Sequence, residues 1–176
     1  MGRERVRSMK KLVFVDCEAT GPCPWPERGW ALTEFGAVDY ETRKTFHGTL
    51  RASAPSLENP ALSVLTDDKE FDIVDVMTRF EKWLSDLGAG RPIFVSDNPA
   101  FDFQWINYEF LHAIDRNPFG HSGRRISDFF AGLKGDFHKT QEWKEWRQTP
   151  HDHNPVHDAL GNVEAFATML EKFRTK

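Results

Sequence analysis

The apolar run Leu12-Val-Phe-Val15 places the strongest constraint on how this chain can fold. It is short, continuous and flanked by charged residues, so it predicts a strand that is buried on both faces. Such a strand needs one packed layer above it and another below it. Because side chains alternate along a strand, Asp16 and Glu18 should share one face while Cys17 takes the other.

The rest of the sequence predicts an α/β domain with a mixed sheet. Further strands are predicted at residues 32–40 and 44–50, which would form a hairpin, at 93–95 after Pro92, and at 125–128. Helices are predicted from the N-cap Asp72 to Gly88, at residues 99–114, near residue 129, at 139–147 and at 155–173. Residues 21–26 predict a surface loop, because three prolines interrupt regular structure, and residues 53–60 are rich in turn formers.

The length of 176 residues suits one domain with a single core. We place that domain at residues 11–176 and interpret residues 1–10 as a flexible arm or a cloning remnant. The net charge of −4 argues against a global basic field. Neither a bilayer-spanning apolar run nor a secretory signal is visible, and two cysteines make a poor disulfide framework. We therefore expect a cytoplasmic protein with no membrane partner.

Two Asn-Pro pairs mark the starts of predicted helices, Asn98-Pro99 and Asn154-Pro155. Asparagine is a good N-cap, and proline is favoured at the first helical position. Asp102 and Asp158 each follow their asparagine by four residues. Both carboxylates should therefore lie near the first turn of a helix, close to its positive end.

Four carboxylates in one cleft would repel one another unless cations neutralised them. Hard oxygen ligands favour Mg²⁺ or Mn²⁺. Two such ions, roughly 3.5–4 Å apart, would bind the attacking and leaving oxygens of a phosphoryl displacement. His153 lies five residues before Asp158, and its ordinary pKa suits a general base that activates water.

These residues resemble the motifs of the DEDDh branch of the DEDD 3′→5′ exonucleases. Val15-Asp-Cys-Glu-Ala-Thr-Gly21 is similar to the first motif, and Asn98-Pro-Ala-Phe-Asp-Phe103 to the second. His153-Asn-Pro-Val-His-Asp158 is similar to the third, and Leu32-Thr-Glu-Phe-Gly-Ala-Val38 to the second strand of that family. Each motif is weak alone, whereas the three in order are specific. The resemblance spans about residues 11–173.

The resemblance implies a ribonuclease H-like single domain, with a five-stranded mixed sheet flanked by helices. It also implies a metal-dependent exonuclease that releases 5′-mononucleotides from the 3′ end of single-stranded RNA or DNA. One metal ion would be bound by Asp16, Glu18 and Asp158. The second would rest mainly on Asp16, with Asp102 acting largely through water. Ala19-Thr20 and the proline-rich insertion resemble the oligoribonuclease-sized and Eri-like exoribonucleases, which favours RNA slightly.

The expected substrate contacts lie near the acids in sequence. Trp25 and Trp30 flank the loop after Glu18, where an aromatic ring could splay the terminal nucleotide. Trp143 and Trp146 are interpreted instead as a packed helix face. The full set of expected substrate contacts is Ala19, Thr20, Trp25, Trp30, Asn98 and Phe101.

Two alternatives stay open at this stage. The chain could be an inactive nucleic-acid-binding domain on the same fold, which loss of a motif acid would favour, and none is missing. It could also be a zinc hydrolase that uses His151, His153 and His157, although Pro155 interrupts any helix between the last two. RNA against DNA, substrate length and pathway are not encoded in these patterns, and a homodimer is possible without being indicated.

Overall fold

The computed structural model describes residues 11–50 and 72–174. The predictions for residues 1–10 and for the turn-rich segment 53–60 lie outside this part. The described chain forms a five-stranded mixed sheet in the order β3-β2-β1-β4-β5. Its strands are β1 (Leu12–Ala19), β2 (Leu32–Asp39), β3 (Thr45–Thr49), β4 (Ile93–Ser96) and β5 (Gly123–Arg125). The expected five-stranded α/β architecture is confirmed.

The sheet combines a hairpin with a parallel half. β1 pairs antiparallel with β2, and β2 pairs antiparallel with β3. β1 pairs parallel with β4, which pairs parallel with β5. The central β1 therefore has a hydrogen-bonded neighbour on both edges, as its continuous apolar run predicts.

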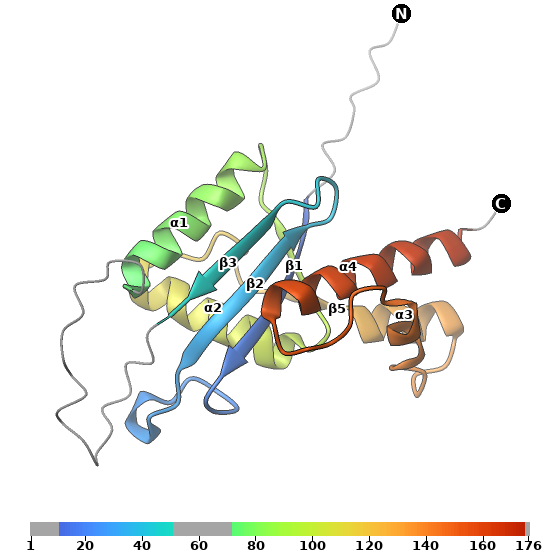
Figure 1. Ribbon diagram of the computed structural model, residues 1–176, viewed down its shortest axis with the longest axis horizontal. Coiled ribbons are helices and arrows are strands. Elements are labelled where there is room, and N and C mark those ends of the chain that lie inside the picture. Colours follow the sequence, from blue (N-terminus) through green and yellow to red (C-terminus); the bar gives the residue numbers. More distant parts are fainter. Residues whose placement is uncertain (1–10, 51–71, 175–176) are drawn as a thin grey trace, which may run out of the picture.

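Helices cover both faces of the sheet (Figure 1). They are α1 (Ile73–Asp86), α2 (Pro99–Ile114), α3 (Ile126–Lys134) and α4 (Pro155–Lys172), with short 3₁₀ turns η1 (Pro26–Arg28) and η4 (Glu142–Trp146). Val13, Val15 and Cys17 pack with residues of α1 and α2. Phe14 packs on the opposite side with residues of α3, η4 and α4. This alternation places Asp16 and Glu18 on the α4 side of the sheet.

Two expected N-caps behave differently. The Asn154 side chain accepts hydrogen bonds from the backbone N–H groups of Val156 and His157, as predicted. Asn98 makes no side-chain cap bond. The backbone carbonyls of Asn98 and Asn154 accept equivalent helical hydrogen bonds from the N–H groups of Asp102 and Asp158. The Asn-Pro pattern therefore locates both helix starts, but only one of the two amides serves as a cap.

β1 runs through both acids to Ala19, as the predicted alternation of Asp16 and Glu18 requires, and β2 pairs with it along that length. Two predicted elements need correction. The strand expected at 125–128 lies earlier, at 123–125, and α3 begins at Ile126 because Ile126 and Phe130 point together into the core. Residues 139–147 contain the 3₁₀ turn η4 rather than an α-helix.

None of the described helices is long and apolar enough to cross a membrane.

Candidate active site

The site begins on β1, where Asp16 and Glu18 point to the same face. Asp16 lies opposite Gly36 of β2 in the strand register. A Cβ atom at Gly36 would overlap the backbone of Pro155, at the first turn of α4. Glycine at this position therefore lets the start of α4 approach the sheet beside Asp16.

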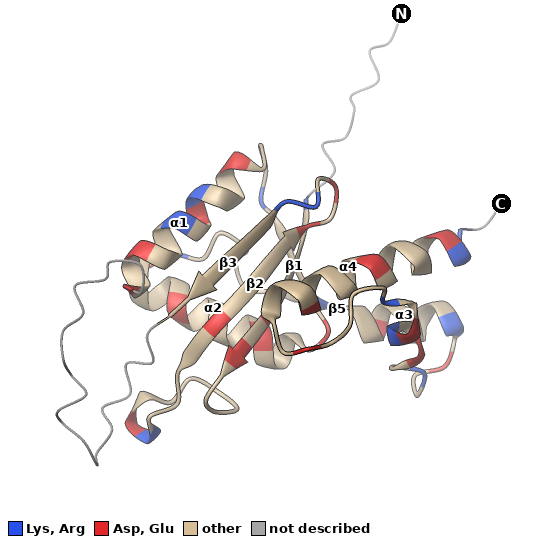
Figure 2. Ribbon diagram, viewed as in Figure 1, with Lys and Arg blue, Asp and Glu red and all other residues tan. Residues whose placement is uncertain are grey.

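That close approach brings Asp158 to the acids of β1. Asp158 lies in the first turn of α4 and is fully buried. Single carboxylate oxygens of Asp16, Glu18 and Asp158 lie within 4.8 Å of one another. Figure 2 shows acidic positions of β1, α2 and the segment before α4 near the same end of the sheet.

Asp102 reaches this region from the start of α2 and is held separately. One of its carboxylate oxygens accepts a hydrogen bond from the backbone N–H of Cys17, at 3.2 Å. Its side chain is almost completely buried. Asp102 is not part of the tight group of three, yet its charge acts on Asp16. The structure thus brings all four predicted acids to one region, with three in closest contact.

The electrostatics of the site are dominated by burial and repulsion. Burial raises the pKa of Asp16 from 3.8 to about 8, and repulsion by Asp102, Asp158 and Glu18 adds to the effect. Burial also raises the pKa of Asp102 to about 7. Arg147 acts in the opposite direction and lowers the pKa of Asp16. Without cations, the site therefore favours protonated carboxyl groups near neutral pH.

The donor set fits a hard divalent cation. Both carboxylate oxygens of Asp158 are buried without a partner in hydrogen-bond geometry. His151 Nδ1 lies 2.7 Å from one of these oxygens, but it does not complete a hydrogen bond. A buried carboxylate with unused lone pairs, beside two more carboxylates, matches the oxygen ligands that Mg²⁺ and Mn²⁺ prefer.

Two of the three histidines face the acids. His153 Nδ1 lies 3.4 Å from a Glu18 carboxylate oxygen, and its side chain is 75% exposed. The ring of His151 lies 4.5 Å from the ring of His153. His157 turns away and pairs with Asp152 at 2.9 Å.

The zinc alternative finds no support in this geometry. Among residues 11–50 and 72–174, the only group of three potential ligands at metal-binding distances is Asp16, Glu18 and Asp158. The three histidines do not form such a group.

The expected aromatic contacts border the site on the α2 side. Trp25 is 45% exposed and packs edge-on against Trp30, with ring centroids 6.1 Å apart. The Arg28 guanidinium lies over the Trp25 ring, 4.8 Å from its centroid. Gln104 of α2 donates a hydrogen bond to the Pro22 carbonyl and so ties this loop to α2.

The remaining expected contacts have mixed surroundings. Ala19 and Phe101 are partly buried against the α1–α2 core, whereas Asn98 is exposed. The Thr20 hydroxyl accepts a hydrogen bond from the Ala31 N–H at 2.9 Å, which closes the base of the loop. Trp143 is fully buried, and Trp146 packs edge-on against Phe130, so the packed interpretation of both tryptophans is confirmed.

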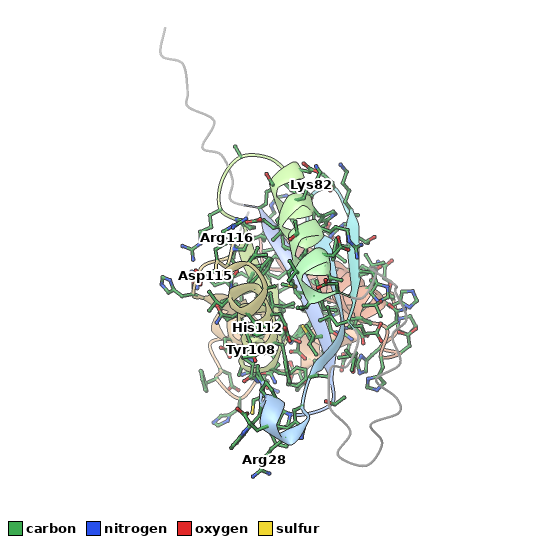
Figure 3. The ribbon with its side chains drawn as sticks, turned by 90° about the vertical axis from the view of Figure 1, so that its left-hand side faces the viewer. Arg28, Lys82, Tyr108, His112, Asp115 and Arg116 are labelled. Atoms are coloured by element: carbon green, nitrogen blue, oxygen red, sulfur yellow. The ribbon has the colours of Figure 1, made fainter. Side chains whose placement is uncertain are left out.

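The outer surface of α2 continues away from this loop. The rings of Tyr108 and His112 are parallel, with centroids 5.7 Å apart. Figure 3 shows both side chains on the same side of the molecule as Arg28. This surface was not predicted, although a spacing of four residues on a helix places two side chains on one face.

Sequence reasoning also missed three residues behind the site. Arg147, Asn162 and Glu164 connect the segment before α4 to α4 itself. Asn162 follows Asp158 by one helical turn, and this spacing was the available signal. Nothing in the sequence placed Arg147 beside them, because it precedes α4 and is brought back by the chain reversal.

Comparisons with known proteins concern the fold and the class of protein. The chain is 28% identical over 186 residues to the 3′-5′ DNA exonuclease Cap18 of Escherichia coli, with 97% of each chain covered. It superposes with a TM-score of 0.66 on the crystallographic structure of the nuclease domain of 3′hExo, a DEDDh family member bound to rAMP. That match covers 93% of this chain and 92% of the other at 15% identity. No protein-family model matches the chain.

The chain therefore has a ribonuclease H-like fold. The ordered motifs and the relative that matches over 97% of both chains support the resemblance to the DEDDh 3′→5′ exonucleases.

Proposed function

We propose that this protein hydrolyses the last phosphodiester bond at the 3′ end of a single-stranded nucleic acid and releases 5′-mononucleotides. One observation carries the proposal. Asp16 and Glu18 of β1 and Asp158 of α4 each place one carboxylate oxygen within 4.8 Å of the other two. Buried carboxylates this close repel strongly, and the arrangement is stabilised when divalent cations occupy it. The resemblance to the DEDDh exonucleases also implies divalent metal ions.

The four acids would divide the work of holding two Mg²⁺ or Mn²⁺ ions. Asp16, Glu18 and Asp158 supply a three-carboxylate ligand set for one ion. The charge of Asp102 raises the pKa of Asp16, so these two acids are close enough to be candidate ligands for the second ion. When bound, the ions would neutralise charge that develops on the phosphoryl oxygens.

His153 is the proposed general base. Its largely exposed ring lies at the mouth of the acidic site and can meet a water molecule that enters from solvent. The Glu18 carboxylate, 3.4 Å from Nδ1, would orient the ring. As the water oxygen bonds to phosphorus, the imidazole takes the water proton. The bond from phosphorus to the 3′ oxygen of the shortened strand breaks, and that oxygen leaves as a hydroxyl after protonation.

Two observations bear on whether the substrate is DNA or RNA, and they point in opposite directions. The full-length relative is named as a DNA exonuclease, which favours DNA, whereas the motif resemblance favours RNA slightly. The exposed Trp25 ring offers a base-stacking surface that would serve either polymer. We therefore propose a single-stranded 3′ end as the substrate, with contacts from Trp25, Trp30 and Phe101, and with Ala19, Thr20 and Asn98 as lesser candidates.

A digestion series tests the activity. Single-stranded DNA and RNA oligonucleotides, labelled at either the 5′ or the 3′ end, are incubated with the protein and with Mn²⁺, Mg²⁺ or EDTA. We expect metal-dependent shortening from the 3′ end and immediate release of a labelled mononucleotide from 3′-labelled strands. Endonucleolytic fragments would contradict the proposal. Binding without cleavage would support an inactive binding domain.

Matched variants connect the activity to the acids. Asp16→Asn and Asp158→Asn keep the shape of each side chain and remove its charge, so turnover should fall to background. Asp128→Asn is the control, because Asp128 also lies in the first turn of a helix but pairs with Arg125 on the surface. Retained turnover in the first two variants would refute the assignment of these ligands.

A further inference from the structure

We propose that Arg147 and Glu164 position the active site through two separate contacts, which we call the two points of a latch. Arg147 would fix the Asp158 carboxylate, and Glu164 would fix the histidine loop, which we define as residues 148–154. Both are positioning residues, because neither needs to touch substrate or metal. The inference rests on the proposed function only for its effect on turnover, since the effect on metal binding is measured separately.

The first point of the latch is a buried cation next to a buried acid. The Arg147 side chain is 12% exposed, and one guanidinium nitrogen lies 3.8 Å from an Asp158 carboxylate oxygen. Another guanidinium nitrogen donates a hydrogen bond to the Asn162 side-chain oxygen, one helical turn further along α4. Arg147 therefore spans two successive turns of the helix that carries the proposed metal ligand.

This contact compensates a charge that would otherwise be costly. Asp158 is fully buried, and neither of its oxygens has a partner in hydrogen-bond geometry. His151 Nδ1 lies 2.7 Å from one oxygen and is charged only when protonated, whereas the Arg147 guanidinium lies 3.8 Å from the other oxygen and is always charged. An isolated buried carboxylate is strongly unfavourable, and removing one member of a buried pair leaves the other uncompensated. Arginine suits this role because it keeps its charge at every physiological pH and its planar group is rigid.

The packing around Arg147 leaves its side chain little freedom. Its guanidinium lies 5.8 Å from the centroid of the buried Trp143 ring. On the other side is Gly161 of α4, where a Cβ atom would lie 2.8 Å from the Thr149 carbonyl oxygen and 3.3 Å from Arg147 Cδ. A larger residue at 161 would push this segment away from α4. Gly161 therefore permits the contact that Arg147 makes.

The second point of the latch fixes the start of the histidine loop. One Glu164 carboxylate oxygen accepts from the backbone N–H groups of Gln148 and Thr149, at 3.0 and 2.7 Å. The other accepts from the Thr149 hydroxyl at 3.0 Å. The loop ends at the Asn154 cap of α4. Both ends of the loop are therefore anchored to one helix, which limits where His151 and His153 can lie.

Metal binding tests the first point without any substrate. Metal-stripped protein is titrated with Mn²⁺ in a calorimeter at pH 7. Arg147→Met keeps the apolar stem and removes the charge, and we expect Mn²⁺ affinity to fall about 10- to 100-fold, the usual cost of losing a partner behind a metal ligand. Arg147→Lys should recover part of this loss because it restores the charge. Unchanged or tighter Mn²⁺ binding by Arg147→Met would overturn the proposal.

Two further variants keep that test informative. Lys139→Met is the control, because Lys139 lies just before η4 and pairs with Glu142 at 2.6 Å on the surface. It should bind Mn²⁺ like the wild type. If Arg147→Met fails to fold, Asn162→Ala removes only the group that orients Arg147 and should weaken Mn²⁺ binding to a smaller extent. Wild-type Mn²⁺ affinity in Asn162→Ala would then overturn the proposal.

Turnover tests the second point. Glu164→Gln weakens the three bonds to the loop, so we expect kcat to fall about 10-fold or more because the proposed base is no longer held in place. Mn²⁺ affinity and KM should stay near their wild-type values. Glu171→Gln, an exposed acid two turns further along α4, is the control and should change none of these values. Wild-type kcat in Glu164→Gln would overturn this part of the latch.

These measurements separate the latch from the proposed function. If the wild-type protein degrades no nucleic acid, the exonuclease proposal fails while the Mn²⁺ titrations still test Arg147. If the wild type is active and Arg147→Met equals it in Mn²⁺ affinity, the latch fails and the exonuclease proposal stands.

Discussion

Gly36 of β2 packs directly against the backbone of Pro155, at the start of the helix that carries Asp158. Gly36 also lies opposite Asp16 in the strand register. One glycine thus sets the distance between the acids of the sheet and the acid of the helix. No side chain can occupy this position without moving α4 outward, which would widen the proposed metal site.

Replacing Gly36 by alanine should therefore disturb both stability and the site. Overpacking a tight contact costs about 1–3 kcal/mol, and here the neighbouring atoms belong to the backbone and cannot rotate away. We expect a lower thermal midpoint and weaker Mn²⁺ binding, measured by melting curves and calorimetry. Gly132→Ala is the control, since nothing lies within 4 Å of a Cβ atom there and the change should stabilise α3. Wild-type Mn²⁺ affinity in Gly36→Ala would show that α4 can shift without cost.

The pH dependence of stability should report the buried acids. In the metal-free protein, burial raises the pKa of Asp16 from 3.8 to about 8 and that of Asp102 to about 7. Between pH 4 and 8 the native state therefore keeps protons that the unfolded chain has lost. Stability from these groups is greatest at low pH and falls as pH rises through that window. The thermal midpoint of EDTA-treated protein should decrease accordingly.

Two comparisons isolate this effect from other titrating groups. Asp16→Asn cannot ionise, so its midpoint should fall less steeply with pH than that of the wild type. Saturating Mn²⁺ should also flatten the wild-type curve, because bound cations stabilise the ionised carboxylates. Parallel pH curves for Asp16→Asn and the wild type, both without metal, would contradict the raised pKa of Asp16.

His153→Ala should separate catalysis from metal binding. A positioned general base contributes about 10²- to 10⁴-fold to turnover, so kcat should fall by a factor in that range. The ring touches Glu18 at 3.4 Å but is not needed as a ligand, so Mn²⁺ affinity should change little. His157→Ala is the control, because His157 pairs with Asp152 and faces away. Full turnover in His153→Ala together with loss in His151→Ala would transfer the role of base to His151.

The sequence predicted the parts of this fold that depend on local signals. Pro99 and Pro155 locate two helix starts, and strand alternation correctly places Asp16 and Glu18 on one face, opposite Cys17. These patterns work because the proline ring and the strand geometry act on neighbouring residues. The same local patterns predicted where the four acids lie, with two on β1 and one each in the first turns of α2 and α4.

The parts that were missed depend on contacts between distant segments. The role of Arg147 depends on its contact with Asp158, which α4 brings beside it. The need for glycine at position 36 depends on the close approach of the Pro155 backbone. Local propensity carries no information on such contacts, because they form through the tertiary fold.

The loop after β1 should contribute to substrate affinity more than to chemistry. Trp25 is 45% exposed, and its ring contacts Trp30 and Arg28, so it offers an exposed ring on which a base could stack. Stacking on an aromatic ring is worth about 1–3 kcal/mol per base, so Trp25→Ala should raise KM by about 5- to 150-fold. The acids are untouched, so kcat should stay within a few-fold of the wild type.

Single-turnover and steady-state digestion of one oligonucleotide would check this split between KM and kcat. Phe137→Ala serves as the control, because Phe137 is an aromatic side chain with 81% exposure located between α3 and η4, away from the loop after β1. If any exposed aromatic side chain could bind the nucleic acid, Trp25→Ala and Phe137→Ala would weaken binding to the same extent. An effect confined to Trp25→Ala would support contact between the terminal bases and the loop after β1. An unchanged KM in Trp25→Ala would show that the strand leaves the site along another surface.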